Sequence, residues 1–397
     1  MPEFTTLPPL SLYIHLPWCV KKCPYCDFNS HTFDSGLPEM QYPEAQYIDA
    51  LIADLENQLP SIWGRRIVSV FIGGGTPSLF SAESINKIMT TIRSHLNCLP
   101  NMEVTMEANP GTVEQNKFNG FFEAGINRLS IGVQSFADEK LKALGRIHNA
   151  DEALNAVEVA RKAGFKNINL DLMFGLPGQD IEQAVSDLQQ AIDLSPQHIS
   201  WYQLTIEPNT FFYSHPPVTP KDDDIWEMQQ KGQRLLAEAG YEQYEISAYA
   251  KKNNQKNNQC LHNLNYWQFG DYLALGAGAH GKISRADTGE IKRYWQIRKP
   301  ADYMQAGAQN KSSGSEDLLT EQIVFEFMLN ALRLKQGFEI STFELNTGLK
   351  AELISSKCEL AIKEGLLEKK RDGHKISGYQ ASEQGYLFLN DLINIFS

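Results

Sequence analysis

Six short runs rich in apolar and β-branched residues alternate with longer segments of helical periodicity along the first half of the chain. The candidate strands are 11–16, 67–72, 103–108, 128–133, 168–174 and 199–206. Segments such as AQYIDALIADLENQL and EALNAVEVARKAG lie between them, the latter ended by Gly164 in the manner of a helix C-cap. Repeated βα units build parallel sheets, and a closed barrel needs eight of them. The sequence therefore predicts an α/β fold with a partial, six-unit barrel.

Motifs typical of functional loops follow five consecutive candidate strands. In chain order they are PWCVKKCPYC, GGGTP, ANPGT, QSF and GLPG. Barrel enzymes carry their sites on the loops at the C-terminal ends of the strands, so we expect these motifs to meet at one end of the barrel. The three glycines of GGGTP would let backbone amides approach a ligand closely, although a tight strand-to-helix turn would explain them equally well.

Three of the six cysteines, Cys19, Cys23 and Cys26, form the pattern C-x3-C-x2-C in the first of these loops. A structural zinc site usually has four protein ligands, and a [4Fe–4S] cube has four irons that each need one. Three thiolates on such a cube would leave one iron free to bind a small molecule. A zinc site and three incidental cysteines are the alternatives.

Composition places the chain among cytosolic globular proteins. Its formal net charge of −12 argues against sequence-independent binding of nucleic acid, which needs a basic surface. The N-terminal stretch lacks the basic and apolar parts of a signal peptide, and no apolar run is long enough for a transmembrane helix. Clustered cysteines do not make a disulfide framework, so the expected location is the reducing cytoplasm.

The cysteine pattern, with Tyr25 before its last cysteine, resembles the signature of the radical S-adenosylmethionine superfamily. The resemblance implies that the cysteines hold a [4Fe–4S] cluster whose free iron binds the amino and carboxylate groups of S-adenosylmethionine. Reduction of the cluster then cleaves the sulfonium to a 5′-deoxyadenosyl radical. It also implies further cofactor contacts, with Arg146 able to pair with the ligand carboxylate. These contacts are Tyr13, Tyr25, Gly74, Gly75, Thr76, Glu107, Gln134, Arg146 and Asp171.

From about residue 11 to residue 335 the chain resembles the oxygen-independent coproporphyrinogen III dehydrogenases and their relatives, through YIHLPWC, GVQSF, DLMFGLPGQ and YEISAYA. Two features favour the haem chaperone branch, the HemW-type proteins. Phe28 stands where the dehydrogenases have a further cysteine, and HNLNYW, from His262, matches the branch pattern H-N-x-x-Y-W. This resemblance implies haem binding and delivery of haem to respiratory haemoproteins. Dehydrogenase activity, or another radical reaction on a tetrapyrrole, is the alternative.

Neutral imidazole is a standard axial ligand of haem iron, so His262 is the predicted ligand and Cys260 a competing one. Tyr266 and Trp267 could stack on the macrocycle, and lysines of the polar loop 251–259 could meet its propionates. The resemblance names haem and haem-receiving proteins as partners. A second copy of the chain and a membrane surface are further candidates, the latter because the implied recipients are membrane-bound.

The sequence divides into four parts. We expect a barrel core over 1–215, an extension carrying the HNxxYW pattern over 216–305, a linker over 306–317 and a helical domain over 318–397. The last part combines a long helical pattern with an Asp372-Gly373 pair suited to a tight hairpin, which is typical of winged-helix domains.

Overall fold

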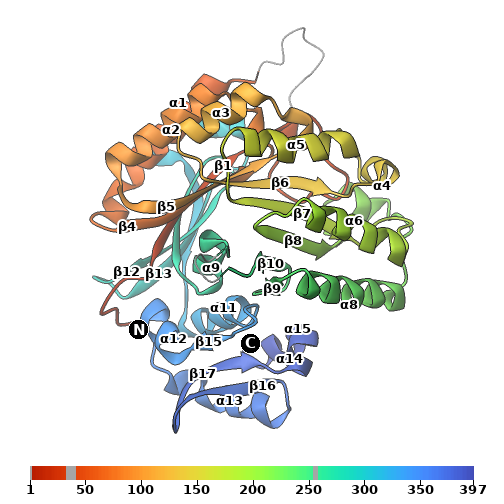
Figure 1. The fold of residues 1–397 in the computed structure, drawn as a ribbon. Coiled ribbons are helices and arrows are strands. Elements are labelled where there is room, and N and C mark those ends of the chain that lie inside the picture. Colours follow the sequence, from red (N-terminus) through yellow and green to blue (C-terminus); the bar gives the residue numbers. More distant parts are fainter. Residues whose placement is uncertain (1, 33–41, 254–257) are drawn as a thin grey trace.

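The computed structural model describes residues 2–32, 42–253 and 258–397 (Figure 1). Six parallel strands form the centre of a twelve-stranded sheet, in the order β1-β4-β5-β6-β7-β8. Each coincides with a predicted strand, which confirms the six βα units. Their bounds are Leu10–Leu16 (β1), Arg66–Gly74 (β4), Asn97–Ala108 (β5), Arg128–Gln134 (β6), Ile168–Phe174 (β7) and His198–Gln203 (β8).

Further strands extend this sheet on both sides. Beyond β8 lie β10 (Ala248–Lys251) and β9 (Tyr241–Gln243), and beyond β1 lie β11 (Asp271–Leu275), β12 (His280–Arg285), β13 (Glu290–Gln296) and β14 (Ser312–Asp317). Within the described residues the two outermost strands, β9 and β14, do not pair with each other, so the barrel is partial, as predicted. The segment 306–317 is not a free linker, because β14 pairs with β13 along most of its length.

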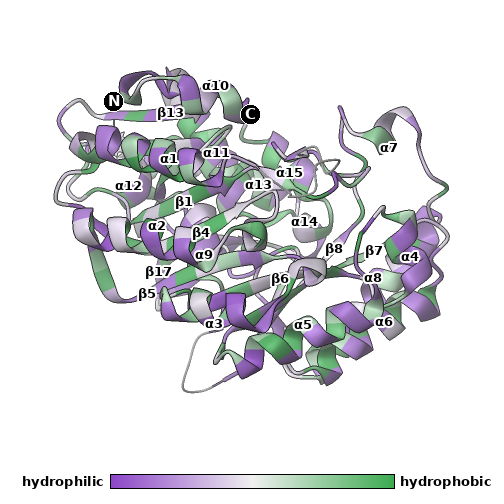
Figure 2. Cartoon of the chain, turned by 90° about the horizontal axis from the view of Figure 1, so that it is seen from above, coloured by the Kyte–Doolittle hydropathy of each residue, from purple (hydrophilic) through white to green (hydrophobic). Residues whose placement is uncertain are grey.

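Amphipathic helices cover the outer face of the parallel strands (Figure 1). In α5, the buried residues Ala153, Ala156, Val157 and Ala160 recur at the spacing of one helix face. Figure 2 shows the resulting mixture of hydrophobic and hydrophilic residues on these helices. Their bounds are Glu44–Gln58 (α1), Ala82–His95 (α2), Gln115–Glu123 (α3), Asp138–Ala143 (α4), Ala150–Lys162 (α5), Ile181–Asp193 (α6) and Asp222–Glu238 (α8).

The short helix α9 (Leu261–Trp267) lies between the barrel and the C-terminal domain (Figure 1). It contacts β1, β4 and β11 on one side and α11 (Thr320–Ala331) on the other. Two further short helices are α7 (Phe211–Ser214) and α10 (Pro300–Gln305). No helix in the described parts of the chain is both long and apolar enough to cross a bilayer.

The C-terminal domain has a separate hydrophobic core and a three-stranded sheet in the order β15-β17-β16. Gly373, with φ +59°, lies in the tight turn between β16 and β17, so the predicted hairpin is confirmed. Helices followed by this hairpin give the predicted winged-helix-like arrangement. The elements after α11 are β15 (Phe338–Glu339), α12 (Ile340–Thr347), α13 (Glu352–Lys363), β16 (Leu367–Asp372), β17 (Lys375–Ala381), α14 (Glu383–Leu387) and α15 (Leu389–Asn394).

Candidate cofactor site in the barrel

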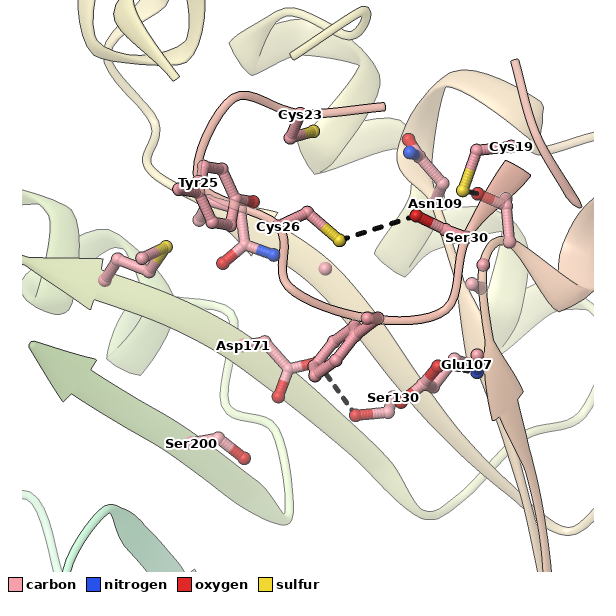
Figure 3. A pocket seen from close by; sticks show the side chains of 18 of the residues that line it. Cys19, Cys23, Tyr25, Cys26, Ser30, Glu107, Asn109, Ser130, Asp171 and Ser200 are labelled. Carbon is pink, nitrogen blue, oxygen red and sulfur yellow. Dashed lines mark hydrogen bonds between the residues drawn. The ribbon is translucent and has the colours of Figure 1, made fainter. Parts of the chain in front are cut away.

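The three cysteines of the C-x3-C-x2-C pattern line one cavity of about 490 Å³ at the C-terminal ends of the strands (Figure 3). Cys19 ends the short strand β2 (Trp18–Cys19), which pairs with β3 (His31–Thr32) and fixes the base of the loop. Phe28 also lines the cavity, with 60% of its side chain exposed. The loop therefore brings all three thiols to the space where the other predicted motifs meet.

The cysteine sulfurs make long contacts with protein side chains. Thr76 Oγ1 donates to Cys19 Sγ at 3.4 Å, Ser30 Oγ lies 3.6 Å from Cys26 Sγ, and Arg146 Nη1 donates to Cys23 Sγ at 3.8 Å. Among the residues that the structure describes, no three His, Cys, Asp or Glu side chains converge closely enough to hold one metal ion. Thiols that share a cavity without converging suit a larger iron–sulfur cluster better than a zinc ion.

Burial would keep two of the thiols, those of Cys19 and Cys26, protonated in the absence of a metal group. It raises the pKa of Cys19 to about 11, and it also raises the pKa of Cys26. A thiolate is the form that binds metal, so a cationic centre is needed to stabilise the ionised sulfurs here. The chemistry of the donor set therefore fits a cluster bound through these residues.

The glycines of GGGTP bring the end of β4 against the cysteine loop. A Cβ on Gly75 would lie 2.6 Å from the carbonyl oxygen of Trp18, which is too close for any other residue. The amides of this stretch donate within the protein: Gly74 to Glu107 Oε2 at 3.0 Å, Gly75 to the Leu16 carbonyl at 2.8 Å, and Thr76 to the Trp18 carbonyl at 2.8 Å. These three amides are therefore engaged within the protein and are not free to donate to a ligand.

Two acidic side chains, Glu107 and Asp171, face the cavity below the cysteine loop (Figure 3). Burial, followed by the neighbouring charge of Asp171, raises the pKa of Glu107 to about 8. Burial also raises the pKa of Asp171, although hydrogen bonds from Ser130, Asn169 and Ser200 partly offset this effect. Both acids would become more stable as carboxylates beside a cationic ligand.

Arg146 lies between the cysteine loop and β6. Its Nη2 donates to the Gly132 carbonyl at 2.8 Å, while its Nε is buried and has no hydrogen-bond partner among the described residues. Gln134 ends β6 in a left-handed conformation, with φ +69°, and its Oε1 accepts from the Tyr202 hydroxyl at 2.9 Å. The unsatisfied N–H of Arg146 is a donor available to a carboxylate in the cavity.

Eight of the nine predicted cofactor contacts line this cavity, and Tyr13 does not. The Tyr13 hydroxyl lies 2.9 Å from His15 Nδ1, and its ring stacks on Phe71 at a centroid distance of 6.3 Å. Tyr13 therefore contacts the cavity wall through Phe71. The residues that do line the cavity are Tyr25, Gly74, Gly75, Thr76, Glu107, Gln134, Arg146 and Asp171.

His262, in the first turn of α9, lies at the opposite end of the barrel from the cysteines. Its Nδ1 is 3.2 Å from Ser69 Oγ, and its ring packs at a centroid distance of 5.0 Å from Phe71, which lines the cavity. Burial, followed by the positive charge of Arg128, lowers the pKa of His262 to about 3. The imidazole is therefore neutral at physiological pH, the form that binds iron. His262 itself does not line the cavity, whereas Asn263 does.

Cys260, the competing candidate, is fully buried at the N-terminus of α9. Its thiol donates to Glu103 Oε1 at 3.4 Å, and burial raises its pKa to about 12. The thiol is thus engaged with a carboxylate, and Cys260 does not line the cavity that holds the other three thiols. A structural role for Cys260 agrees with this environment better than ligation does.

The aromatic residues of the HNxxYW pattern contact other groups than His262: Trp267 meets the C-terminal domain and Tyr266 meets β11. The Arg333 guanidinium lies over the Trp267 ring at 4.3 Å, and Tyr266 packs against Trp267 and Tyr272. The prediction that Tyr266 and Trp267 stack on a macrocycle held by His262 therefore does not agree with this arrangement.

The predicted propionate contacts of the polar loop 251–259 fall partly outside the described residues, which leave out 254–257. Of the described lysines, Lys252 pairs with Glu242 at 2.6 Å, and Lys251 lies over the Tyr241 ring. These two lysines interact with β9.

Comparisons with known proteins agree with this geometry. A family model described as the radical SAM superfamily matches residues 13–191, and one described as the HemN C-terminal domain matches residues 318–388. The chain is 50% identical over 396 residues to the heme chaperone HemW of Haemophilus influenzae, and 47% identical over 390 residues to that of Escherichia coli. Each comparison covers 98% of both chains. The chain belongs to the HemW family of the radical SAM superfamily.

Among solved structures, coproporphyrinogen III oxidase (HemN) from Escherichia coli matches this HemW-family chain with a TM-score of 0.79 at 23% identity. The match covers 98% of this chain and 90% of that one. At this identity the likeness shows the fold alone. It agrees with the partial barrel and the C-terminal domain that the sequence predicted.

Several inward-facing residues of the HemW-family barrel join the predicted Gln134 and Asp171 in the cavity, although they lie outside the sequence motifs. On β6, Arg128, Ser130, Gly132 and Gln134 all line the cavity, because alternate residues of a strand share one face. The sequence RLSIGVQ carries this signal, since its apolar residues alternate with the inward set. On the neighbouring strands the same alternation brings in Asn169, Asp171, Met173, Ser200 and Tyr202.

Proposed function

We propose that this chain is a haem-binding chaperone that carries a [4Fe–4S] cluster and S-adenosylmethionine and delivers haem to respiratory haemoproteins. The observation that carries the proposal is the similarity, over 98% of the chain, to proteins named heme chaperone HemW. Membership of the radical SAM superfamily implies the cluster and S-adenosylmethionine. Haem as the bound cargo is inferred from the names of the relatives.

In this proposal Cys19, Cys23 and Cys26 hold the cluster. Arg146 binds the carboxylate of S-adenosylmethionine, which is supported by its unsatisfied Nε. Glu107 and Asp171 accept from the amine or the ribose hydroxyls, which their position in the cavity supports. When bound, the cluster and S-adenosylmethionine together supply reductive cleavage of a sulfonium. The remaining proposed contacts are Tyr13, Tyr25, Gly74, Gly75, Thr76 and Gln134.

His262 is the proposed ligand of the haem iron. Its low pKa supports this role, because the imidazole nitrogen stays unprotonated over the physiological range. The Phe71 ring stands beside His262 at the cavity wall. A macrocycle held in the cavity near His262 would therefore also contact this ring.

The proposed location is the cytoplasm, which is supported by six cysteines that are all free of disulfides. A second copy of the chain and a membrane surface are proposed as partners during delivery. Light scattering of the haem-loaded protein and flotation with anionic lipid vesicles would test these two partners.

The first experiment is a titration of haem into anaerobically reconstituted protein, followed through the Soret band. Wild type is compared with His262→Ala and with His374→Ala, a matched control at the exposed hairpin turn. We expect stoichiometric binding by wild type and the control, and a lost or shifted Soret band for His262→Ala.

The same preparations are assayed for coproporphyrinogen turnover with S-adenosylmethionine and a reductant. The chaperone proposal expects none. Turnover to protoporphyrinogen without haem binding would contradict the proposal and would indicate a dehydrogenase. If His262→Ala binds haem as wild type does, the chaperone proposal stands but His262 is not the haem ligand.

A further inference from the structure

Arg128 is a buried arginine at the end of the cavity farthest from the cysteines, which we call the floor of the barrel. It begins β6, is 2% exposed and lines the cavity. None of its guanidinium nitrogens forms a hydrogen bond or an ion pair with any described residue, and its Nε is completely enclosed. A buried guanidinium keeps its charge, so its N–H groups need acceptors that the described chain does not provide.

Other buried cations in this chain are paired. Lys282, 1% exposed, contacts Asp271 at 2.8 Å, and Lys140, 6% exposed, donates to the Gly178 carbonyl at 2.6 Å. Leaving a buried charge unpaired is strongly destabilising, so unpaired buried cations are rare. The contrast indicates that the partner of Arg128 comes from outside the described chain.

The acids nearest to Arg128 are engaged with other groups. Glu103 Oε1 accepts from the Cys260 thiol at 3.4 Å and from the His262 amide at 3.2 Å. Asp171 accepts from Ser130 at 2.8 Å and from Asn169 at 2.8 Å. Both acids act on Arg128 through their charge but form no ion pair with it.

Several other side chains around the guanidinium are neutral and add no charge that would repel an anion. Ser130, Asn169, Ser200 and Asn263 line the same floor and are neutral hydrogen-bonding side chains. Burial, followed by the charge of Asp171, raises the pKa of Glu107 to about 8, which reduces the repulsion of an incoming anion by Glu107 near neutral pH. His198 and His262 are uncharged there, because burial and Arg128 lower the pKa of both.

We propose that Arg128 binds a carboxylate of a ligand held in the barrel, through the two parallel N–H groups of its planar fork. This inference rests on the proposed haem binding, because haem carries two propionates and its proposed ligand His262 borders the same floor through Phe71. The carboxylate of S-adenosylmethionine is the other source. Arg146 contacts Cys23 and is therefore the guanidinium beside the cluster, which favours the propionate as the partner of Arg128.

The test compares haem with haem dimethyl ester, which has the same ring and metal but lacks the carboxylates. Binding of both is measured on reconstituted wild type, Arg128→Gln and Arg128→Lys. The control is Arg66→Gln, an exposed arginine that begins β4 as Arg128 begins β6. We expect wild type and the control to prefer haem by about tenfold or more, Arg128→Gln to lose this preference, and Arg128→Lys to keep part of it.

A second arm compares S-adenosylmethionine with its decarboxylated analogue on the same variants. If Arg128→Gln alters the preference in this arm alone, the carboxylate site stands and its ligand is S-adenosylmethionine. Equal loss of haem and ester binding in Arg128→Gln, with neither preference changed, would overturn the site and leave a structural arginine.

Wild type itself supplies a readout that does not depend on a folded variant. Equal binding of haem and its ester by wild type, together with equal binding of S-adenosylmethionine and its decarboxylated analogue, would overturn the inference. Absence of haem binding by wild type would instead overturn the proposed function, while the second arm would still test Arg128.

Discussion

At the rim of the barrel the cysteine sulfurs make long contacts of 3.4 to 3.8 Å with protein side chains, whereas at the floor Asn169 uses its whole amide in hydrogen bonds. Asn169 Nδ2 donates to Ser130 at 2.7 Å and to Asp171 at 2.8 Å. Its Oδ1 accepts from Ser200 at 3.1 Å and lies 2.6 Å from His198 Nδ1. The rim has open bonding capacity for a ligand to complete, while the floor is already organised by the chain and leaves the Arg128 Nε without a partner among the described residues.

The floor network is continuous from the cavity to α9. From Asn169 it runs through His198 to the Tyr244 hydroxyl, which accepts from the Cys260 amide at 3.3 Å. Cys260 and His262 then share Glu103. Substitutions at the rim should therefore mainly affect ligand binding, whereas substitutions at the floor should affect folding as well.

The largest expected effect is loss of the cluster in Cys26→Ser. Iron content should fall from about four atoms per chain to near zero, because the loop would retain only two thiolates. Haem binding at the floor should change less than twofold if the two regions are independent. Iron and sulfide analysis measures the first effect, with Cys98→Ser as the control. A parallel loss of haem binding would show that the rim and the floor are not independent.

The next largest effect is expected for Asn169→Ala, because it leaves several buried polar groups without partners. The free energy of unfolding should fall by about 3 kcal/mol. Asn119→Ala is a matched control that removes one hydrogen bond, from Gln115, and should cost less than about 1 kcal/mol. Urea unfolding of the cluster-free protein measures both. Similar losses in the two variants would mean that the floor is no more tightly organised than a helix surface.

Arg146→Gln should weaken S-adenosylmethionine binding by about 10- to 100-fold, which is the expected loss of a charge-assisted pair. Arg146→Lys should lie between this variant and wild type, since it keeps the charge without the fork. Equilibrium dialysis with the reconstituted protein measures the affinities. An unchanged affinity in Arg146→Gln would show that the carboxylate binds elsewhere at the rim.

The pH dependence of this binding should follow Glu107. Its pKa of about 8 is raised, so the acid is largely protonated at pH 7. A bound sulfonium cation favours the carboxylate and lowers that pKa, so binding releases a proton. Affinity should therefore increase with pH up to about pH 8, by at most about tenfold per pH unit, and then level off. Calorimetry in buffers of different ionisation enthalpy measures the released proton, and Glu107→Gln should remove most of it.

The smallest expected effect is that of Arg333→Gln, at the contact between α9 and the C-terminal domain. Loss of the cation–π contact with Trp267 and of the 3.4 Å pair with Glu245 should destabilise the protein by roughly 1 kcal/mol. Thermal unfolding measures the change. A loss of stability larger than that of Asn169→Ala would show that this contact stabilises the protein more than the floor network does.

The rim could be predicted from the sequence because its groups follow the strands in chain order. The floor could not, because Arg128, His198, Tyr244 and Glu103 become neighbours only through the order of the strands. The polar–apolar alternation of β6 was the signal available.

β5 begins at Asn97, six residues before its predicted start, because pairing with Arg66 and Ile67 of β4 orders a stretch that has no strand pattern. Pairing with β13 likewise orders the supposed linker.

The position of α9 has a consequence for the unfolding of the whole chain. On one side Asn265 Nδ2 donates to Ser11 in β1 at 2.8 Å, and on the other Asn346 of the C-terminal domain donates to the Gln268 carbonyl at 2.8 Å. One short helix and the residue that follows it are thus tied by hydrogen bonds to both the barrel and the C-terminal domain. Neither domain can lose its structure without exposing surface of the other, so the barrel and the C-terminal domain should melt in a single cooperative transition rather than in two.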